Sequence, residues 1–160
     1  MRVTRLLDVP HVVQLDEYDC GPAALAAVLA FHDVPATLAE LTPLADPNHG
    51  TPPDVLVTEI RRRGLEVEFG SYSPRQLRQR IRADEPVLVC LQAWDASSDD
   101  DGHWCVVKGF TRAGLFVLED PSEDEDVVLT EEELLDRWHD RDGDGVRYER
   151  FGVVVRLVGD

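Results

Sequence analysis

The feature of this sequence that most constrains its fold is a change of hydrophobic periodicity near residue 84. Helical spacing dominates before that point and predicts four helices and one strand: helices at 20–31, 38–44, 55–63 and 74–82, and the strand at 65–69. Apolar and β-branched runs follow and predict strands at 87–91, 104–110, 115–119 and 153–158. This order indicates the α+β class, with N-terminal helices packed on a mostly antiparallel sheet.

Local signals mark where several of these helices begin. A side-chain oxygen just before a helix can accept a hydrogen bond from an unpaired backbone N–H group, and a capping box adds a Glu or Gln three residues later. The sequence offers the capping boxes Ser73 with Gln76 and Thr130 with Glu133, and a cap at Thr51 followed by acidic Asp54. The box at Thr130 predicts a further helix through Trp138 that interrupts the sheet.

Length and charge narrow the classes of function. With 160 residues the chain fits a single domain over residues 1–160, long enough to bury a core. Its 32 acidic and 16 basic residues give a formal net charge of −16 at pH 7. Such a charge repels nucleic acid and anionic lipid, so we expect the protein to bind neither.

The cysteines and the N-terminus indicate the cellular compartment of the protein. Three cysteines far apart in the sequence form no disulfide framework, and none belongs to a C-x-x-C pair typical of zinc sites. No apolar run approaches the roughly 20 residues that cross a bilayer, and the N-terminus has no export signal. We therefore expect a cytoplasmic protein with no membrane span and with at least one thiol free to react.

Cys20 is the candidate nucleophile. Pro22 suits the first turn of a helix, so the helix should begin at Cys20 or the next residue. A thiol there lies beside unpaired N–H groups and the positive end of the helix dipole, which stabilise a thiolate. The alternative is a small buried apolar residue, but the polar flank 16–19 implies exposure. Cys90 and Cys105 lie in apolar strand runs and are interpreted as core or sheet-surface residues.

His103 is the best-placed base among the five histidines. It stands at the head of an apolar strand, directly after the expected turn Ser97–Gly102, so its ring can point from a rigid element into a cleft. The others, which we assign structural or surface roles, are His11, His32, His49 and His139.

Asp120 is the candidate for orienting that histidine. An imidazole base is held in one tautomer by an acceptor on its other nitrogen. Asp120 closes the strand at 115–119, which should pair with the His103 strand through the hairpin 109–114. Pro121 ends that strand and leaves the carboxylate at an exposed edge, although a turn-forming Asp-Pro explains the pair as well.

Gln14 is the candidate oxyanion donor. It precedes Cys20 by six positions, and its side-chain amide and the Cys20 backbone N–H would supply two hydrogen bonds to an oxyanion. In this mechanism the Cys20 thiolate, paired with protonated His103, attacks an amide carbonyl, and the resulting thioester is hydrolysed.

Together these residues resemble the bacteriocin-processing peptidases that remove double-glycine leaders, a family of the papain-like clan. The match is in order as well as in type: Gln14, the run Asp19-Cys20-Gly21-Pro22-Ala23, then Gly102-His103-Trp104 and Asp120-Pro121. The resemblance implies a papain-like α+β fold, cysteine peptidase activity, a peptide or protein substrate and the site roles given above. Many relatives form part of a membrane exporter, whereas we expect a stand-alone domain, with any transporter a separate partner.

Other interpretations of the same residues stay open. The triad would serve a cysteine amidase or an acyl transferase equally well. A peptide-binding domain that does not cleave can also keep the fold, although it would typically have lost Cys20 or His103.

An acidic stretch near the C-terminus has the spacing of a calcium loop. Asp140, Asp142 and Asp144 provide oxygen ligands at alternate positions, but Phe151 stands where the acid at the twelfth position belongs. Glu149 can replace that acid only in a looser geometry, and an acidic surface turn explains the stretch as well. We predict no metal and no cofactor.

Overall fold

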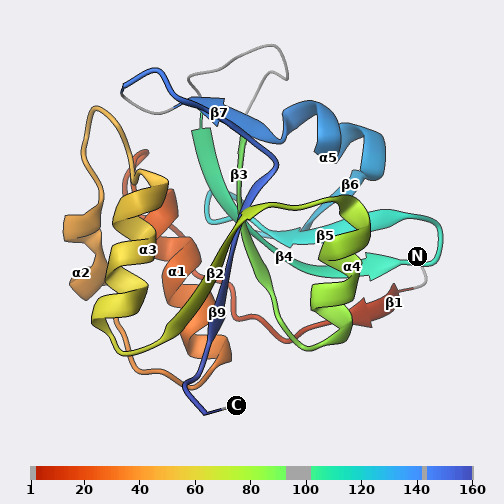
Figure 1. Cartoon of the computed structure of the whole chain (residues 1–160), viewed down its shortest axis with the longest axis horizontal. Coiled ribbons are helices and arrows are strands. Elements are labelled where there is room, and N and C mark those ends of the chain that lie inside the picture. The colour runs from red at the N-terminus through yellow and green to blue at the C-terminus, as the bar shows by residue number, and fades with distance from the viewer. Residues whose placement is uncertain (1–2, 93–101, 142–143, 160) are drawn as a thin grey trace.

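The computed structural model describes residues 3–92, 102–141 and 144–159 (Figure 1). In chain order its elements are β1 (Val3–Leu6), α1 (Cys20–Phe31), α2 (Leu38–Leu41), the 3-10 helix η1 (Thr42–Leu44), α3 (Pro53–Arg62), β2 (Glu66–Ser71), α4 (Pro74–Arg82), β3 (Val87–Gln92), β4 (Gly102–Thr111), β5 (Leu115–Glu119), β6 (Val127–Thr130), α5 (Glu131–Arg137), β7 (His139–Arg141), β8 (Arg147–Glu149) and β9 (Phe151–Arg156).

One sheet forms the centre of the molecule. Its strands lie in the order β2-β9-β3-β4-β5-β6, and β1 pairs with β4 outside that path. Every pairing described within it is antiparallel, and β7 with β8 forms a separate hairpin. Because β4 pairs with β3, β5 and β1 and is buried along nearly its whole length, its side chains are held rigidly.

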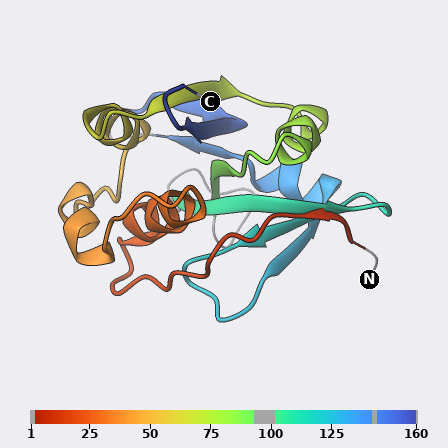
Figure 2. The same ribbon diagram turned by 90° about the horizontal axis from the view of Figure 1, so that it is seen from below.

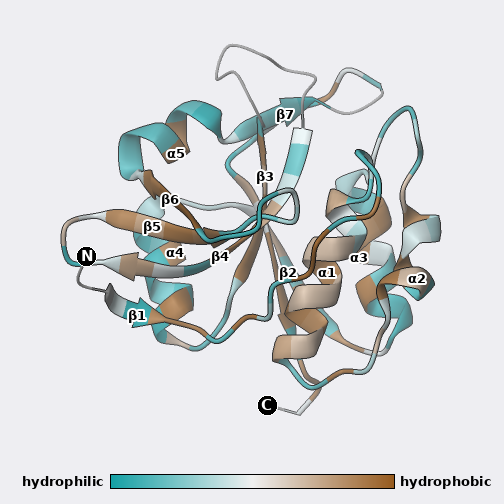
Figure 3. Ribbon diagram, turned by 180° about the vertical axis from the view of Figure 1, so that it is seen from behind, coloured by the Kyte–Doolittle hydropathy of each residue, from teal (hydrophilic) through white to brown (hydrophobic). Residues whose placement is uncertain are grey.

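The helices form two groups around this sheet. In Figure 1, α1, α2 and α3 lie to the left of the strands, and α4 and α5 lie to the right. Figure 2, seen from below, shows the N-terminal segment running along β4 toward α1. In Figure 3 the central strands are largely hydrophobic, whereas α5 is largely hydrophilic. Among the described residues, no helix is long and apolar enough to cross a membrane.

Helix α1 is the helix most deeply enclosed. It begins at Cys20, as the sequence predicts, and all its residues from Cys20 to Leu29 are buried. It contacts α2 and η1 as well as β3 and β4. The run of alanines in this helix permits close approach on several sides, because alanine presents only a methyl group. A helix held in this way places its first residue firmly against the sheet.

The α+β class is confirmed, and both capping boxes are formed. Ser73 caps α4 with Gln76, and Thr130 caps α5 with Glu133, each with both reciprocal hydrogen bonds. The predicted hairpin between β4 and β5 is also present. Local sequence signals therefore located these elements correctly.

Two predicted helices differ from the structure. The helix expected at 38–44 is one α-helical turn followed by η1, because Pro43 lacks the N–H group that would continue the ladder. Helix α3 follows Pro52 rather than a Thr51 cap. Thr51 instead packs against Gly21, where an added Cβ would stand 2.6 Å from the threonine Cβ. Its carbonyl accepts a hydrogen bond from Trp104 Nε1 at 2.8 Å.

The sequence analysis did not predict four short strands: β1, β6, β7 and β8. Each is three or four residues long, too short for a clear alternating pattern. The expected turn Ser97–Gly102 lies outside the described residues except for Gly102, which begins β4.

Candidate active site

Two neighbouring strands bring His103 and Asp120 together. His103 is the second residue of β4, and Asp120 directly follows β5, which runs antiparallel beside β4. Asp120 Oδ1 lies 2.5 Å from His103 Nε2, and both side chains are buried. This hydrogen bond orients the ring and leaves Nδ1 for a second partner.

Ser122 supports the carboxylate. Its backbone N–H and its hydroxyl both donate to Asp120 Oδ1, at 2.9 Å and 2.8 Å. Burial acts to raise the pKa of Asp120, but the hydrogen bond and charge of His103 and the two bonds from Ser122 lower it to about 2. The sequence analysis missed Ser122. The signal was available, because an aspartate often bonds the N–H group two residues further on.

Cys20 lies beside the start of β4. Its Sγ accepts a hydrogen bond from the Trp104 N–H at 3.4 Å. The cysteine is only 5% exposed and Asp19 only 2%, so the exposure expected from the polar flank is wrong. The reason is tertiary, since α1 packs on β3 and β4 and the Asp19 carboxylate turns inward to accept the Asp16 N–H at 3.2 Å.

Two thiols, not one, influence His103. Burial opposes the imidazolium, but the hydrogen bond to Asp120 and the Cys105 and Cys20 thiols outweigh that effect and raise the pKa of His103. Cys105 lies on the same face of β4 as His103, because residues two apart in a strand share a face. Burial raises the pKa of the Cys105 thiol to about 11, and His103 opposes that rise. Cys105 is buried as expected, but it contacts the candidate base.

Within the described parts of the chain, one group of side chains at this site has metal-ligand chemistry. Ligand atoms of His103, Cys105 and Asp120 lie within 4.8 Å of one another. Two atoms bound to one tetrahedral zinc ion, each at about 2 Å, stand roughly 3.3 Å apart. The 2.5 Å separation of His103 Nε2 and Asp120 Oδ1 is instead that of a direct hydrogen bond.

Gln14 lies close to the chain that carries Asp120. Its backbone N–H donates to the Pro121 carbonyl at 3.0 Å, and its Nε2 donates to the Asp16 carbonyl at 2.9 Å. Its Oε1 is buried without a hydrogen-bond partner among the described residues. One of the two N–H groups of the Gln14 amide can therefore donate to another acceptor.

Asp140, the first acid of the stretch with calcium-loop spacing, turns toward the sheet. Its Oδ2 accepts from the Cys90 thiol at 3.2 Å, and its Oδ1 accepts from Gln92 Nε2 at 3.1 Å. These bonds direct the carboxylate to β3, and Asp142 lies outside the described residues. His139 beside it is buried in β7, which fits the structural rather than the surface role expected for it.

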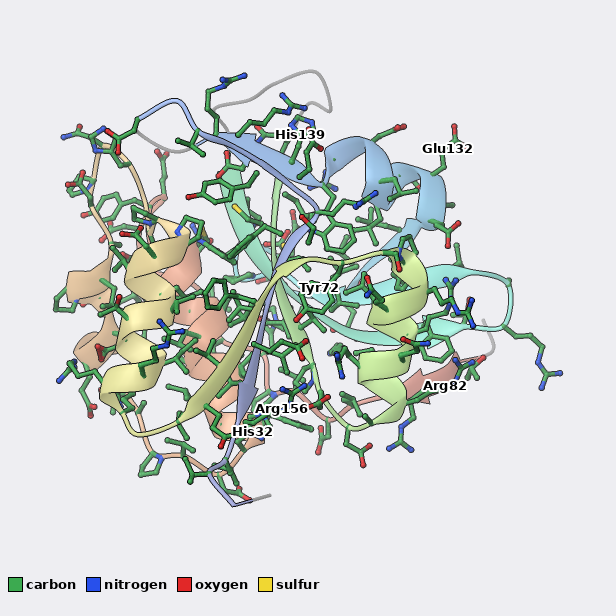
Figure 4. The ribbon with its side chains drawn as sticks, in the orientation of Figure 1. His32, Tyr72, Arg82, Glu132, His139 and Arg156 are labelled. Atoms are coloured by element: carbon green, nitrogen blue, oxygen red, sulfur yellow. The ribbon has the colours of Figure 1, made fainter. Side chains whose placement is uncertain are left out.

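A surface pocket of about 690 Å³ lies at the other end of β4, around Phe110 and Thr111. Its walls include Arg82 of α4 and Glu132 of α5, which Figure 4 shows on the right side of the molecule. Since His103 is at the opposite end of β4, this pocket is separate from the candidate active site.

A buried histidine–aspartate pair at one end of an antiparallel sheet, beside a thiol that begins a helix, is the arrangement of a papain-like cysteine peptidase. The chain belongs to the Peptidase C39 family, whose model matches residues 8–141. No curated protein matches the chain.

Solved structures share this fold at low sequence identity. A putative C39-like peptidase from Bacillus anthracis has a TM-score of 0.75 at 18% identity, with 97% of each chain covered. A double glycine motif protease from an AMS/PCAT transporter, in complex with the leader peptide, has a TM-score of 0.71 at 20% identity, covering 98% of this chain and 97% of that one. The peptidase domain of Streptococcus ComA, a bi-functional ABC transporter, has a TM-score of 0.67 at 17% identity, covering 93% and 98%.

Proposed function

We propose that this cysteine peptidase cleaves a peptide bond with Cys20 as the nucleophile, His103 as the base and Asp120 as the residue that orients the imidazole. The observation that carries the proposal is the 2.5 Å bond between Asp120 Oδ1 and His103 Nε2. It leaves Nδ1 free to serve a thiol, and the Cys20 thiol contributes to the raised pKa of His103.

In the proposed reaction the thiolate attacks the carbonyl carbon and the carbonyl oxygen becomes an oxyanion. His103 then gives its proton to the departing amine and leaves a thioester on Cys20. The same imidazole removes a proton from water, which hydrolyses the thioester. The Trp104 N–H at 3.4 Å from Cys20 Sγ stabilises the thiolate between turnovers.

The oxyanion would be bound by two N–H donors. One is the Cys20 backbone N–H, in the first turn of α1, where N–H groups have no carbonyl partner within the helix. The other is the second N–H of the Gln14 amide, since the first is given to the Asp16 carbonyl. Donors placed before the reaction lower its barrier because they need no reorganisation.

The substrate we infer is a peptide, because a related double glycine motif protease has been seen with a leader peptide. A cytoplasmic location suits the three free cysteines. We propose that residues 1–160 act as one domain, and that any transporter would be a separate partner.

Iodoacetamide labelling of Cys20, read by mass spectrometry across pH, tests the nucleophile and its base. We expect Cys20 to label at least about tenfold faster than Cys90 below about pH 7, because Cys20, unlike Cys90, lies beside an imidazole. His103→Ala should remove that advantage. His49→Ala is the matched control, since His49 is an exposed histidine that pairs with Asp46.

Cys105 is a poor internal standard because it also contacts His103, so Cys90 is the reference thiol. Labelling of Cys20 no faster than Cys90, with an ordinary thiol titration, would instead indicate a peptide-binding domain that keeps the fold. A peptidyl-Gly-Gly-aminomethylcoumarin reporter then measures turnover directly.

A further inference from the structure

Glu119 is a buried carboxylate that the proposed mechanism does not use. It ends β5, immediately before Asp120, and its exposed fraction is 0%. Its Oε1 accepts a hydrogen bond from the Val12 N–H at 3.2 Å and lies 3.0 Å from His11 Nδ1. Its Oε2 is buried without a hydrogen-bond partner among the described residues. A carboxylate satisfied only in part is costly to bury, so its position points to a role in the neighbouring site.

The residues that Glu119 holds lead directly to Gln14. The Val12 N–H donates to Glu119, and two positions later the Gln14 N–H donates to the Pro121 carbonyl at 3.0 Å. These two bonds fasten the segment to the chain on either side of Asp120. The place of the proposed oxyanion donor therefore depends on the Glu119 carboxylate.

The charge of Glu119 changes near neutral pH. The charged or titratable groups around it are His11, Lys108, Asp120 and Asp126. Burial is the main cause that raises its pKa to about 7. Its acidic neighbours add to that rise, and the Val12 hydrogen bond and Lys108 oppose it. Lys108 is itself paired with Asp126 at 2.7 Å. An ionised carboxylate accepts the Val12 N–H and a protonated His11 more strongly than a neutral carboxyl group does.

We propose that Glu119 is a positioning residue that couples protonation to the placement of Gln14. When Glu119 is ionised, it holds the segment 11–14 against the end of β5, and the Gln14 amide is aligned with the catalytic histidine and aspartate. When it is protonated, the hold weakens and the oxyanion donor is displaced. This inference rests on the proposed function and adds a pH-dependent regulation of the same site.

The test compares Glu119→Gln with the wild type by turnover of the Gly-Gly reporter between about pH 5.5 and about pH 8.5. Wild-type kcat should rise through about pH 7, whereas the variant should lack that rise. At about pH 8 its kcat should be lower by roughly tenfold, a part of the ~10²- to 10³-fold effect of a lost oxyanion donor. KM should change little, because an oxyanion donor acts in the transition state. A purely structural defect would not change kcat alone.

Iodoacetamide labelling separates this proposal from the proposed function. Alkylation needs no oxyanion donor, so Cys20 should label at the same rate in both proteins. Unaltered labelling with identical kcat profiles would overturn the role of Glu119 only. Labelling of Cys20 that is slow in both proteins would instead refute the proposed nucleophile.

Three further measurements test the proposal independently: an NMR titration, a double variant and a variant of the partner His11. The amide NMR signals of Val12 and Gln14 should titrate near pH 7 in the wild type and not in Glu119→Gln. In a Gln14→Ala background, adding Glu119→Gln should lower kcat no further. If Glu119→Gln does not fold, His11→Ala can be used instead. It removes the ion-pair partner of Glu119, whose side chain is 28% exposed and so is less critical for folding. It should then weaken the same rise of kcat, and an unchanged kcat profile would contradict the proposal.

Discussion

Two carboxylates, buried Asp120 and half-buried Asp140, lie near the beginning of β4, and each faces a thiol in a different way. Asp120 reaches the thiols of Cys20 and Cys105 through the His103 ring. Asp140 contacts the Cys90 thiol directly, at 3.2 Å. Only in the first arrangement does an imidazole stand between the carboxylate and the thiols.

The electrostatic consequences are opposite. The pKa of Asp120 falls to about 2 because the hydrogen bonds and charge of its partners outweigh burial. Burial raises the pKa of Asp140, since its hydrogen bonds do not compensate for lost hydration. Burial and the nearby Asp140 charge also raise the pKa of the Cys90 thiol. A carboxylate near a thiol therefore makes a candidate catalytic site only when an imidazole stands between them.

The largest expected contrast is in activity. Asp120→Asn should lower kcat by roughly 10⁴-fold, on the scale seen when the orienting acid of a triad is lost. Asp140→Asn should leave kcat within about twofold, because its carboxylate touches no proposed catalytic group. Turnover of the Gly-Gly reporter measures both, and an equal loss in the two variants would break the comparison.

The next contrast is in the pH dependence of stability. A lowered pKa in the folded state means that Asp120 stabilises the fold above its unfolded pKa of about 4 and loses this effect as pH falls toward 2. At 1.36 kcal/mol per pKa unit, Asp120→Asn should lower the free energy of unfolding by about 2 kcal/mol at neutral pH and by much less near pH 2.

Asp140 should show the opposite slope. Its raised pKa means that ionisation destabilises the folded state as pH rises. Relative to the wild type, Asp140→Asn should therefore gain stability as pH increases. Urea unfolding at several pH values measures both variants, and parallel slopes would show that the two carboxylates do not differ.

The smallest contrast concerns the packing of Asp140 against the strand that carries His103. A Cβ added at Gly102 would stand 2.4 Å from Asp140 Oδ2, while Cys90 and Gln92 hold that carboxylate in place. Gly102→Ala should lower the free energy of unfolding by about 1 kcal/mol. Much of that loss should disappear in an Asp140→Ala background. Simple additivity in this double-mutant cycle would show that the two groups do not touch.

Much of the fold was readable from the sequence because the signals are local. The boxes at Ser73 and Thr130 fix two helix starts through side-chain bonds three residues apart. Pro22 and the alanines after it locate α1, with Cys20 as its first residue. The short connection between two apolar runs predicted the hairpin that joins His103 to Asp120.

Burial and cross-chain contacts were decided only by the tertiary structure. The polar residues before Cys20 suggested exposure, yet α1 packs so that the thiol is 5% exposed. Cys105 read as a core residue, and strand pairing placed it against the candidate base. Glu119 had no signal at all, because its partners His11 and Val12 are more than 100 residues away in the chain. Local patterns determine which element a residue belongs to, whereas the packing of distant segments determines what its side chain meets.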